Sequence, residues 1–382
     1  MPGAWIPLIA AAAIAFYIMA GYPIVLAALR RRRAPPIAKD LSYQTTVSTI
    51  LTVYNGGAFV RSKLESLFAL DYPKELLEII VVSDGSSDET EAIVQEFSGQ
   101  GVVLLAIPHS GKAAAVNRGL ACATGEILFF TDVRQPLDRM ALRHLVANFA
   151  DPTIGAVSGE LRLVRGDGGE QADMDLYWRY EVWARKRQTA IDSVFNTTGC
   201  IYAMRRNLTE PIPPDTLSDD AVLPQRAFFK GYRVVMDAEA IAMDYPALQG
   251  TEFRRRWRTL AGLWQVFARC PKLFTSSNRM RFHFLSHKFS RLLLPWTILT
   301  ILAATAALPH SPARSWMIGG DCALLLLALV DPVVPARTSL KRLSSPARTF
   351  LAMNLASMAA LVVFFVPAHR LWVPTRVKTA PH

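Results

Sequence analysis

Two carboxylates end two hydrophobic runs that are typical of buried strands. Asp84 ends the run EIIVVSD (78–84), and Asp132 ends the run EILFFTD (126–132). Ligands bind beyond the carboxyl ends of the strands in open α/β sheets, so both side chains are expected at one site. A carboxylate there can accept a hydrogen bond from a base or ribose hydroxyl, or ligate a divalent cation that holds phosphates. The alternative for Asp84, and more so for Asp88, is capping of the following helix.

The segments around these carboxylates alternate between strand patterns and helix patterns. β-forming runs lie at 46–53, 79–84, 102–107 and 126–132, and helix-like segments separate them. The segment after Asp84 has acidic residues in its first turn and glycine at its end, as a capped helix does. This alternation predicts a parallel, doubly wound sheet covered by helices on both faces. The regular pattern ends near residue 165.

Long apolar runs near both ends of the chain predict membrane spans. Residues 4–29 carry no charge and are followed by Arg30–Arg33, and further runs lie at about 291–308, 316–335 and 350–367. A helix needs roughly 20 apolar residues to cross a bilayer core. A cleaved signal peptide, the alternative for the first run, would place its positive charge before the apolar run. Four arginines after it favour a cytoplasmic location for the residues that follow.

Composition narrows the function classes. The chain has 382 residues, a net charge of +11 and 51% hydrophobic residues. A basic balance fits nucleic acid, an anionic membrane surface or a phosphorylated substrate. Nucleic acid lacks support, because no zinc-ligand, RNA-recognition or helix-turn-helix pattern is present. The four cysteines are far apart and are expected to be free thiols. Four spans would place both termini outside, whereas the basic tail (Arg370, Arg376, Lys378) favours a cytoplasmic end, so the topology stays open.

Five segments, in this order, resemble family 2 glycosyltransferases of the GT-A fold. They are ILTVYNGG, LEIIVVSDGSSDET, GKAAAVNRGL, ATGEILFFTDVRQ and IGAVSGEL. The resemblance covers about residues 45–265 and is greatest to membrane-embedded members related to hyaluronan, cellulose and poly-N-acetylglucosamine synthases. It implies a Rossmann-like, doubly wound cytoplasmic α/β domain with transmembrane helices at both ends. The expected division is a first span with its basic stop (1–33), the GT-A domain (34–270), an interfacial segment (271–290) and about three C-terminal spans (291–382).

The resemblance also implies a donor site. Four residues are expected at the nucleotide and its phosphates: Tyr54, Asn55, Asp84 and Lys112. Asp132 takes the place of the first aspartate of the DxD metal motif, which implies Mg²⁺ or Mn²⁺ as cofactor. This sequence departs from the motif, because Arg134 stands where the second acid is usual. Either Asp132, the diphosphate and water hold the cation, or Arg134 partly replaces it, or Arg134 is a plain structural cation.

The segment LSDDAVLPQRAFFKGYRV resembles the region that supplies the catalytic base in this family. Asp220 aligns with the base and Asp219 with the acid before it. The chemistry requires such a group, because an acceptor hydroxyl must lose its proton as it attacks the anomeric carbon. Adjacent side chains usually diverge, so Asp219 is expected to be structural or close to the metal. The alternative for Asp220 is a carboxylate that stabilises a helix start.

The segment EFRRRWRTLAGLWQ (252–265) falls where processive members carry QxxRW. One register pairs Arg256-Trp257 with the motif but lacks its glutamine. The other, which we prefer, is anchored on Gly262 and pairs Arg258-Thr259. Together with Arg255, these side chains are expected to neutralise the departing diphosphate. The alternative is a basic interfacial helix on anionic lipids. The altered motif leaves long-chain processivity open.

The sequence therefore predicts a membrane-bound inverting glycosyltransferase that moves a sugar from a nucleotide-diphosphate donor, a UDP-sugar first, to a polysaccharide or glycan. It is expected to be a multi-pass protein of the inner (plasma) membrane with a cytoplasmic catalytic domain, membrane lipids around it and envelope-assembly partners. Two alternatives remain: transfer of one sugar to a lipid acceptor (polyprenyl phosphate or glycolipid), and a non-catalytic membrane subunit, which Arg134 favours. A transporter is disfavoured, because the spans contain few ionisable residues.

Overall fold

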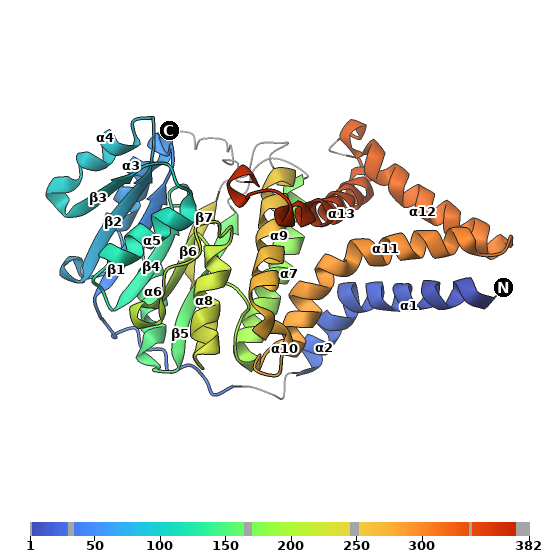
Figure 1. Cartoon of the computed structure of the whole chain (residues 1–382), viewed down its shortest axis with the longest axis horizontal. Helices are drawn as coiled ribbons and strands as arrows, with labels where there is room; N and C mark the ends of the chain where they lie inside the picture. Colours follow the sequence, from blue (N-terminus) through green and yellow to red (C-terminus); the bar gives the residue numbers. More distant parts are fainter. Residues whose placement is uncertain (1, 30–33, 164–169, 245–251, 336–337, 372–382) are drawn as a thin grey trace.

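The computed structural model describes residues 2–29, 34–163, 170–244, 252–335 and 338–371. An α/β body carries a group of long helices that project from one side, and the N-terminus lies at the far end of these helices (Figure 1). The arginines Arg30–Arg33 and the tail residues Arg376 and Lys378 lie outside the described residues.

The centre of the body is one seven-stranded sheet in the order β3-β2-β1-β4-β6-β5-β7. Strands β1 to β4 pair in parallel, whereas β6 is antiparallel to both of its neighbours and β7 is parallel to β5. The prediction of a parallel sheet is thus correct for β1 to β4, whereas the complete sheet contains both parallel and antiparallel pairs. The strands are β1 (Val47–Val53), β2 (Leu77–Asp84), β3 (Val102–Ile107), β4 (Ile127–Asp132), β5 (Ile154–Leu163), β6 (Ile201–Arg205) and β7 (Arg233–Asp244).

Helices cover both faces of this sheet because the side chains of each strand alternate between two cores. Leu51 of β1 packs in one core with Leu64 of the covering helix, while Ile50 packs in the other with Val116. Each such burial contributes about 1.5–3 kcal/mol relative to exposure. The first face carries α3 (Gly57–Phe68), α4 (Thr90–Gln95) and α6 (Ala141–Ala147), and the second carries α5 (Lys112–Cys122) and α8 (Asp219–Phe229).

Two longer helices, α7 (Glu170–Ile191) and α9 (Glu252–Arg269), stand between the sheet and the projecting helices (Figure 1). α9 packs Val266 and Phe267 against Ala221 of α8. The approach is close at Gly262, where an added Cβ would lie 2.2 Å from Ser218 Oγ. A glycine in α9 therefore lets this helix lie directly against the start of α8.

Four described helical segments are long and apolar enough to cross a membrane: Trp5–Ala28, Arg281–Ala307, Pro312–Val333 and Lys341–Phe364. They match the four predicted runs and are the kind of helix that a membrane protein carries. The second begins at Arg281, inside the stretch expected to be interfacial. The helices in these segments are α1 (Trp5–Phe16), α2 (Tyr22–Ala28), α10 (Arg281–Phe284), α11 (Ser290–Ala307), α12 (Pro312–Val330) and α13 (Lys341–Ala359).

The first two spans each contain one π-helical turn, η2 (Tyr17–Gly21) and η9 (Leu285–Phe289), and these turns meet. The Tyr17 hydroxyl lies 2.7 Å from Ser286 Oγ, and the Tyr22 ring stacks on His287 with ring centroids 5.5 Å apart. Gln188 of α7 donates to the Tyr22 hydroxyl at 2.9 Å. α7 is therefore joined to both spans by buried polar contacts.

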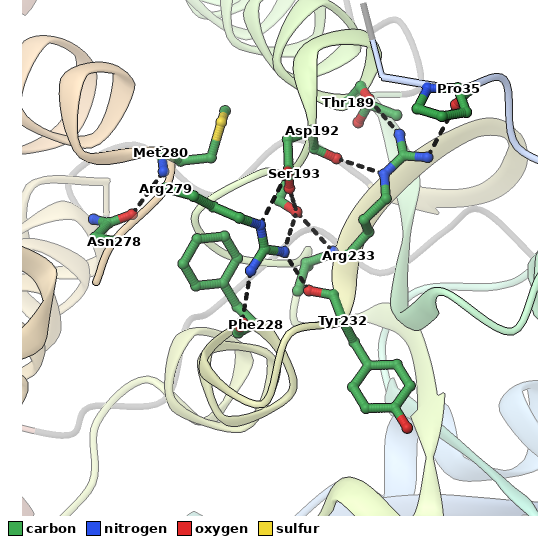
Figure 2. Close-up of polar contacts among 11 residues, drawn as sticks. Pro35, Thr189, Asp192, Ser193, Phe228, Tyr232, Arg233, Asn278, Arg279 and Met280 are labelled. Carbon is green, nitrogen blue, oxygen red and sulfur yellow. Dashed lines mark hydrogen bonds and ion pairs between the residues drawn. The ribbon is translucent and has the colours of Figure 1, made fainter. Parts of the chain in front are cut away.

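Two arginines attach the start of α10 and the segment after the first span to the α/β body (Figure 2). Arg279 binds Asp192 Oδ2 at 2.8 Å and the Phe228 carbonyl at 2.8 Å, and its guanidinium lies 3.9 Å from the centre of the Phe228 ring. Arg233 donates to the carbonyls of Pro35 and Thr189 at 3.1 and 3.0 Å. The spans and the sheet are thus fixed to one another through the end of α7.

Candidate active site

The carboxylate at the end of β2 organises a neighbouring loop. Asp84 accepts hydrogen bonds from the backbone N–H groups of Ser110 (2.7 Å) and Gly111 (2.9 Å), and its Oδ2 lies 3.0 Å from His109 Nδ1. Gly85 follows with φ +68°, and a Cβ there would lie 2.6 Å from the His109 nitrogen. Asp84 is 4% exposed, so its carboxylate holds the loop that leads into α5.

The end of β1 supplies a second wall of the same corner. The ring of Tyr54 stacks on His109 with centroids 4.3 Å apart and an interplanar angle of 26°. Asn55 adopts φ +49°, and its side-chain oxygen accepts a hydrogen bond from the Ser87 backbone at 2.8 Å. Tyr54 therefore adjoins the loop that Asp84 holds, and Asn55 adjoins the turn that follows Asp84.

Asp88 has a local role. Its Oδ2 accepts from the backbone N–H of Gly57 at 2.9 Å, and its Oδ1 accepts from that of Thr90 at 3.1 Å. Gly57 begins α3 and Thr90 begins α4. One carboxylate thus caps two helix starts, as the capping alternative expected.

Lys112, the first residue of α5, joins the two halves of the site. Its Nζ lies 3.0 Å from Asp132 Oδ1 and 3.3 Å from Asp219 Oδ1. Burial alone would raise the pKa of Asp132, but Lys112 and then Arg134 hold that pKa below its usual value. Burial alone would lower the pKa of Lys112, but the surrounding carboxylates raise it, so the ammonium stays charged.

The two adjacent acids at the start of α8 have different surroundings. Asp219 is buried, and it accepts a hydrogen bond from the Tyr202 hydroxyl at 3.3 Å. Asp220 lies at the same site, but among the described residues it forms no ion pair with Lys112. Burial, together with the neighbouring Asp219, raises the pKa of Asp220 to about 7. A carboxylate that titrates near neutral pH can accept a proton from a hydroxyl as that hydroxyl reacts.

Two cations lie at the turn after β4: Arg134, which belongs to the turn, and Lys63, which reaches it from α3. Lys63 of α3 is 1% exposed, and its Nζ donates to the Gln135 carbonyl at 2.6 Å. Burial lowers the pKa of Lys63 to about 7. Arg134 Nη1 is buried and has no hydrogen-bond partner among the described residues. The position of the second DxD acid therefore holds a guanidinium with unused donor capacity.

A cavity of about 950 Å³ brings the two halves of the predicted site together. Six predicted residues line it: Lys112, Asp132, Asp219, Asp220, Arg256 and Arg258. Ser110 and Gly111, which Asp84 holds, line it as well. Tyr54, Asn55 and Arg134 lie outside its lining.

The arginine segment of α9 divides between the cavity and other contacts. Arg256, Arg258 and Thr259 line the cavity. Trp257 instead packs with Ala360 and Leu371 of the C-terminal segment, and Arg255 lies 3.9 Å from Asp244 Oδ2. Arg256 of one register and Arg258 of the other both line the cavity, so the choice between the two registers stays a prediction.

The other end of the cavity reaches the helices that are long and apolar enough to cross a membrane. Its lining there consists of apolar side chains from three spans and a few polar ones at their base: Ile18, Met19, Leu292, Leu294, Phe350, Met353, Tyr180, Lys288 and Arg291. Sequence patterns did not place these residues at the site, because they are far apart along the chain and each resembles ordinary span lining.

The residues present fit a divalent cation at Asp132. Its side chain is 37% exposed, and because Lys112 contacts Oδ1, Oδ2 can serve as a ligand. Magnesium keeps several waters and needs only one or two carboxylates when phosphate oxygens complete its shell. A second group, His144, Asp237 and Glu239, has ligand atoms within 4.8 Å of one another. There the Lys39 ammonium lies 2.9 Å from Asp237 and 2.6 Å from Glu239, so a fixed cation already neutralises it.

Residues 48–212 match the family model described as glycosyl transferase family 2. The chain contains a family 2 glycosyltransferase domain. This domain includes β1 to β6, both predicted strand-end carboxylates and Lys112. Asp219, Asp220 and α9 follow its end and complete the cavity.

Relatives and a solved structure agree with this assignment. The chain is 27% identical over 272 residues to a probable glycosyltransferase of Bacillus subtilis (strain 168), covering 66% of this chain and 63% of the relative. It is 23% identical over 265 residues to a poly-beta-1,6-N-acetyl-D-glucosamine synthase of Staphylococcus aureus (strain COL), covering 67% and 63%. The matches thus span a little under two thirds of the length of these relatives. A mannosyltransferase of Pyrobaculum calidifontis, solved in complex with GDP-Man and Mn²⁺, is similar to 93% of this chain with a TM-score of 0.75 and 25% identity, over 97% of its own length.

Proposed function

We propose that the protein is a membrane-bound inverting glycosyltransferase that moves a sugar from a nucleotide-diphosphate donor to a hydroxyl group of a cell-envelope glycan. The observation that carries this proposal is the position of Asp220. Its carboxyl, with a pKa raised to about 7, lines the same cavity as Lys112 and Arg258. A proton acceptor and cations for a leaving diphosphate are the two groups that single-displacement transfer requires.

Tyr54, Asn55 and Asp84 are proposed to form the nucleotide end of the donor site. Asp84 does so through the loop that it holds, and Tyr54 through the ring that faces His109. Lys112 and Arg258 are proposed to face the diphosphate. The solved mannosyltransferase with its GDP-Man supports a nucleotide-sugar donor of this class. A UDP-sugar is our first choice of donor.

Transfer takes place in one displacement. The acceptor oxygen attacks the anomeric carbon and gives its proton to the Asp220 carboxylate. The bond from that carbon to the diphosphate breaks, and its electron pair leaves on the diphosphate oxygen, which inverts the configuration. Lys112, Arg256 and Arg258 stabilise the charge that develops there. A divalent cation, Mg²⁺ or Mn²⁺, would be held by Asp132 and would add Lewis-acid stabilisation of the same charge.

The acceptor is either a growing polysaccharide or a lipid-linked molecule. The synthase among the relatives favours the first. The second is favoured by a specific feature, because three spans form one end of the cavity. We place the catalytic domain (34–270) on the cytoplasmic side of the inner membrane, with spans in 1–33 and 291–382. An interfacial segment (271–290) connects the catalytic domain to the C-terminal spans.

The test is release of nucleoside diphosphate by the purified full chain over a panel of UDP- and GDP-sugars, with Mg²⁺, with Mn²⁺ and with a chelator. Turnover of one donor that Asp220→Asn abolishes, while the variant still binds nucleotide, is the expected result. Full transfer by Asp220→Asn would remove the base assignment. Absence of both turnover and nucleotide binding would favour the non-catalytic alternative. Sizing of the labelled product separates polymer from single transfer.

A further inference from the structure

At the span end of the cavity, a buried carboxylate contacts two cationic side chains of the described residues. Glu181 of α7 is 5% exposed. Its carboxylate contacts Lys288 Nζ, and its Oε2 lies 3.1 Å from Arg291 Nη1 and 3.2 Å from His287 Nε2. Burial would raise the pKa of Glu181, but these neighbours hold it well below its usual value, so the carboxylate is ionised. Among the described residues, the Lys288 and Arg291 side chains thus both contact this one carboxylate.

A further cation extends this charge toward the catalytic acids. Arg185 lies one helical turn after Glu181 on α7, is 4% exposed, and donates to Thr198 Oγ1 at 2.7 Å. It is among the cations that act against the raised pKa of Asp220. Buried charge is costly unless an opposite charge compensates it. Lys288 and Arg291 also line the cavity, so both side chains can contact an anion bound there while they contact Glu181.

Beyond these two cations the cavity wall is apolar. It is formed by Ile18 and Met19 of the first span, Leu292 and Leu294 of the second, and Phe350 and Met353 of the fourth. A ligand that fills the cavity from end to end therefore has an apolar tail between the spans, an anionic group at Lys288 and Arg291, and a polar part that reaches Asp220. A phosphate-linked glycolipid has these three parts in this order.

We propose that Lys288 and Arg291 form the subsite for the phosphate or diphosphate of a lipid-linked saccharide, which is the acceptor. The inference rests on the proposed function, because it identifies the acceptor class of that same site. The phosphate itself is not the nucleophile. A phosphate monoester is largely ionised at neutral pH and needs no base, whereas Asp220 is placed for a hydroxyl of the saccharide. The lipid enters between the first, second and fourth spans.

Binding of three probes to the purified full chain tests this subsite: farnesyl phosphate, farnesol and inorganic phosphate. We expect farnesyl phosphate to bind at least tenfold more tightly than either of the others. Lys288→Gln and Arg291→Gln are each expected to weaken farnesyl phosphate binding roughly tenfold, as loss of a charge-assisted hydrogen bond does. The matched control is Arg281→Gln, an exposed cation at the start of the same span that does not line the cavity. Its affinity is expected to stay unchanged.

Three results would overturn the subsite. They are equal affinity for farnesol, full affinity in both glutamine variants, and competition by inorganic phosphate at the same concentrations as farnesyl phosphate, which would assign the cations to a free anion. Nucleotide-sugar binding on each sample reports folding, and Lys288→Arg, which keeps the charge, should retain lipid binding if Lys288→Gln fails to fold. A wild-type chain that binds farnesyl phosphate but turns over no donor would instead contradict the proposed function.

Discussion

A single carboxyl group, Asp220, is expected to set the pH dependence of transfer. Its pKa is raised to about 7 by burial and by Asp219. As the base it must be ionised, so activity should rise about tenfold per pH unit below 7 and level off above it. A rate profile from pH 5 to 9 at saturating donor measures this. A profile that is flat between pH 5 and 7 would contradict the assignment.

The same group affects stability with a definite sign. A carboxyl whose pKa is higher in the folded chain than in the unfolded chain costs stability as the pH rises from about 4 through about 7. Asp220→Asn should therefore raise the melting temperature by a few degrees at pH 8 and have little effect near pH 4. Thermal unfolding at both pH values tests this, and a variant that melts lower at pH 8 would contradict it.

Lys112 is expected to be needed for donor binding and for the integrity of the site. Its ammonium lies 3.0 Å from Asp132 and 3.3 Å from Asp219, so Lys112→Met leaves the partly exposed Asp132 and the buried Asp219 without this shared cation. We expect donor affinity to fall at least tenfold, as measured by calorimetry with a UDP- or GDP-sugar. Lys230→Met is the control, because the ion pair that Lys230 forms within the described part of the chain is with the exposed Glu210. Equal affinity in Lys112→Met and the control would remove Lys112 from the donor site.

At the scale of elements, the joint between α10 and the end of α7 makes a measurable contribution to stability. Arg279→Ala removes the contacts to Asp192, the Phe228 carbonyl and the Phe228 ring (Figure 2). Hydrogen bonds to charged groups contribute roughly 1.5–3 kcal/mol each when partly buried, so melting should fall by several degrees. Arg281→Ala, an exposed arginine two residues later, is the matched control. Equal melting of the two variants would show that the joint contributes nothing.

The elements show where sequence patterns suffice. β1 to β4 and their helices follow from alternating runs, because each parallel strand is joined to the next by a local helix. The antiparallel β6 does not follow, because the alternation of strand and helix patterns ends near residue 165, before this strand begins. Asp84, Asp132 and Asp220 were expected from strand ends and from resemblance. Lys63 was not, because a buried lysine on a helix face has no distinguishing pattern.

At the scale of the whole molecule, the cavity depends on contacts that no local pattern encodes. Its lining comes from α5, α8, α9 and three spans. The four spans themselves were predictable, because length and hydropathy define them. Ile18 and Phe350 line the same cavity as Asp220. Their position there depends on how the π-helical turns and Gly262 allow the helices to approach one another.

The cavity extends from the residues proposed for sugar transfer to apolar side chains of the spans. This extent has a practical consequence for handling the protein. An alkyl maltoside detergent has a saccharide head and an apolar tail, so it shares two of the three parts of the proposed acceptor and lacks its anionic group. We expect dodecyl maltoside to inhibit transfer competitively with acceptor but not with donor, and lipid nanodiscs to relieve that inhibition. Initial rates at several detergent concentrations test it. Inhibition that is competitive with the donor would place the detergent outside the acceptor site. If dodecyl maltoside competes with acceptor as expected, a detergent without a sugar head is the safer choice for every assay of this protein.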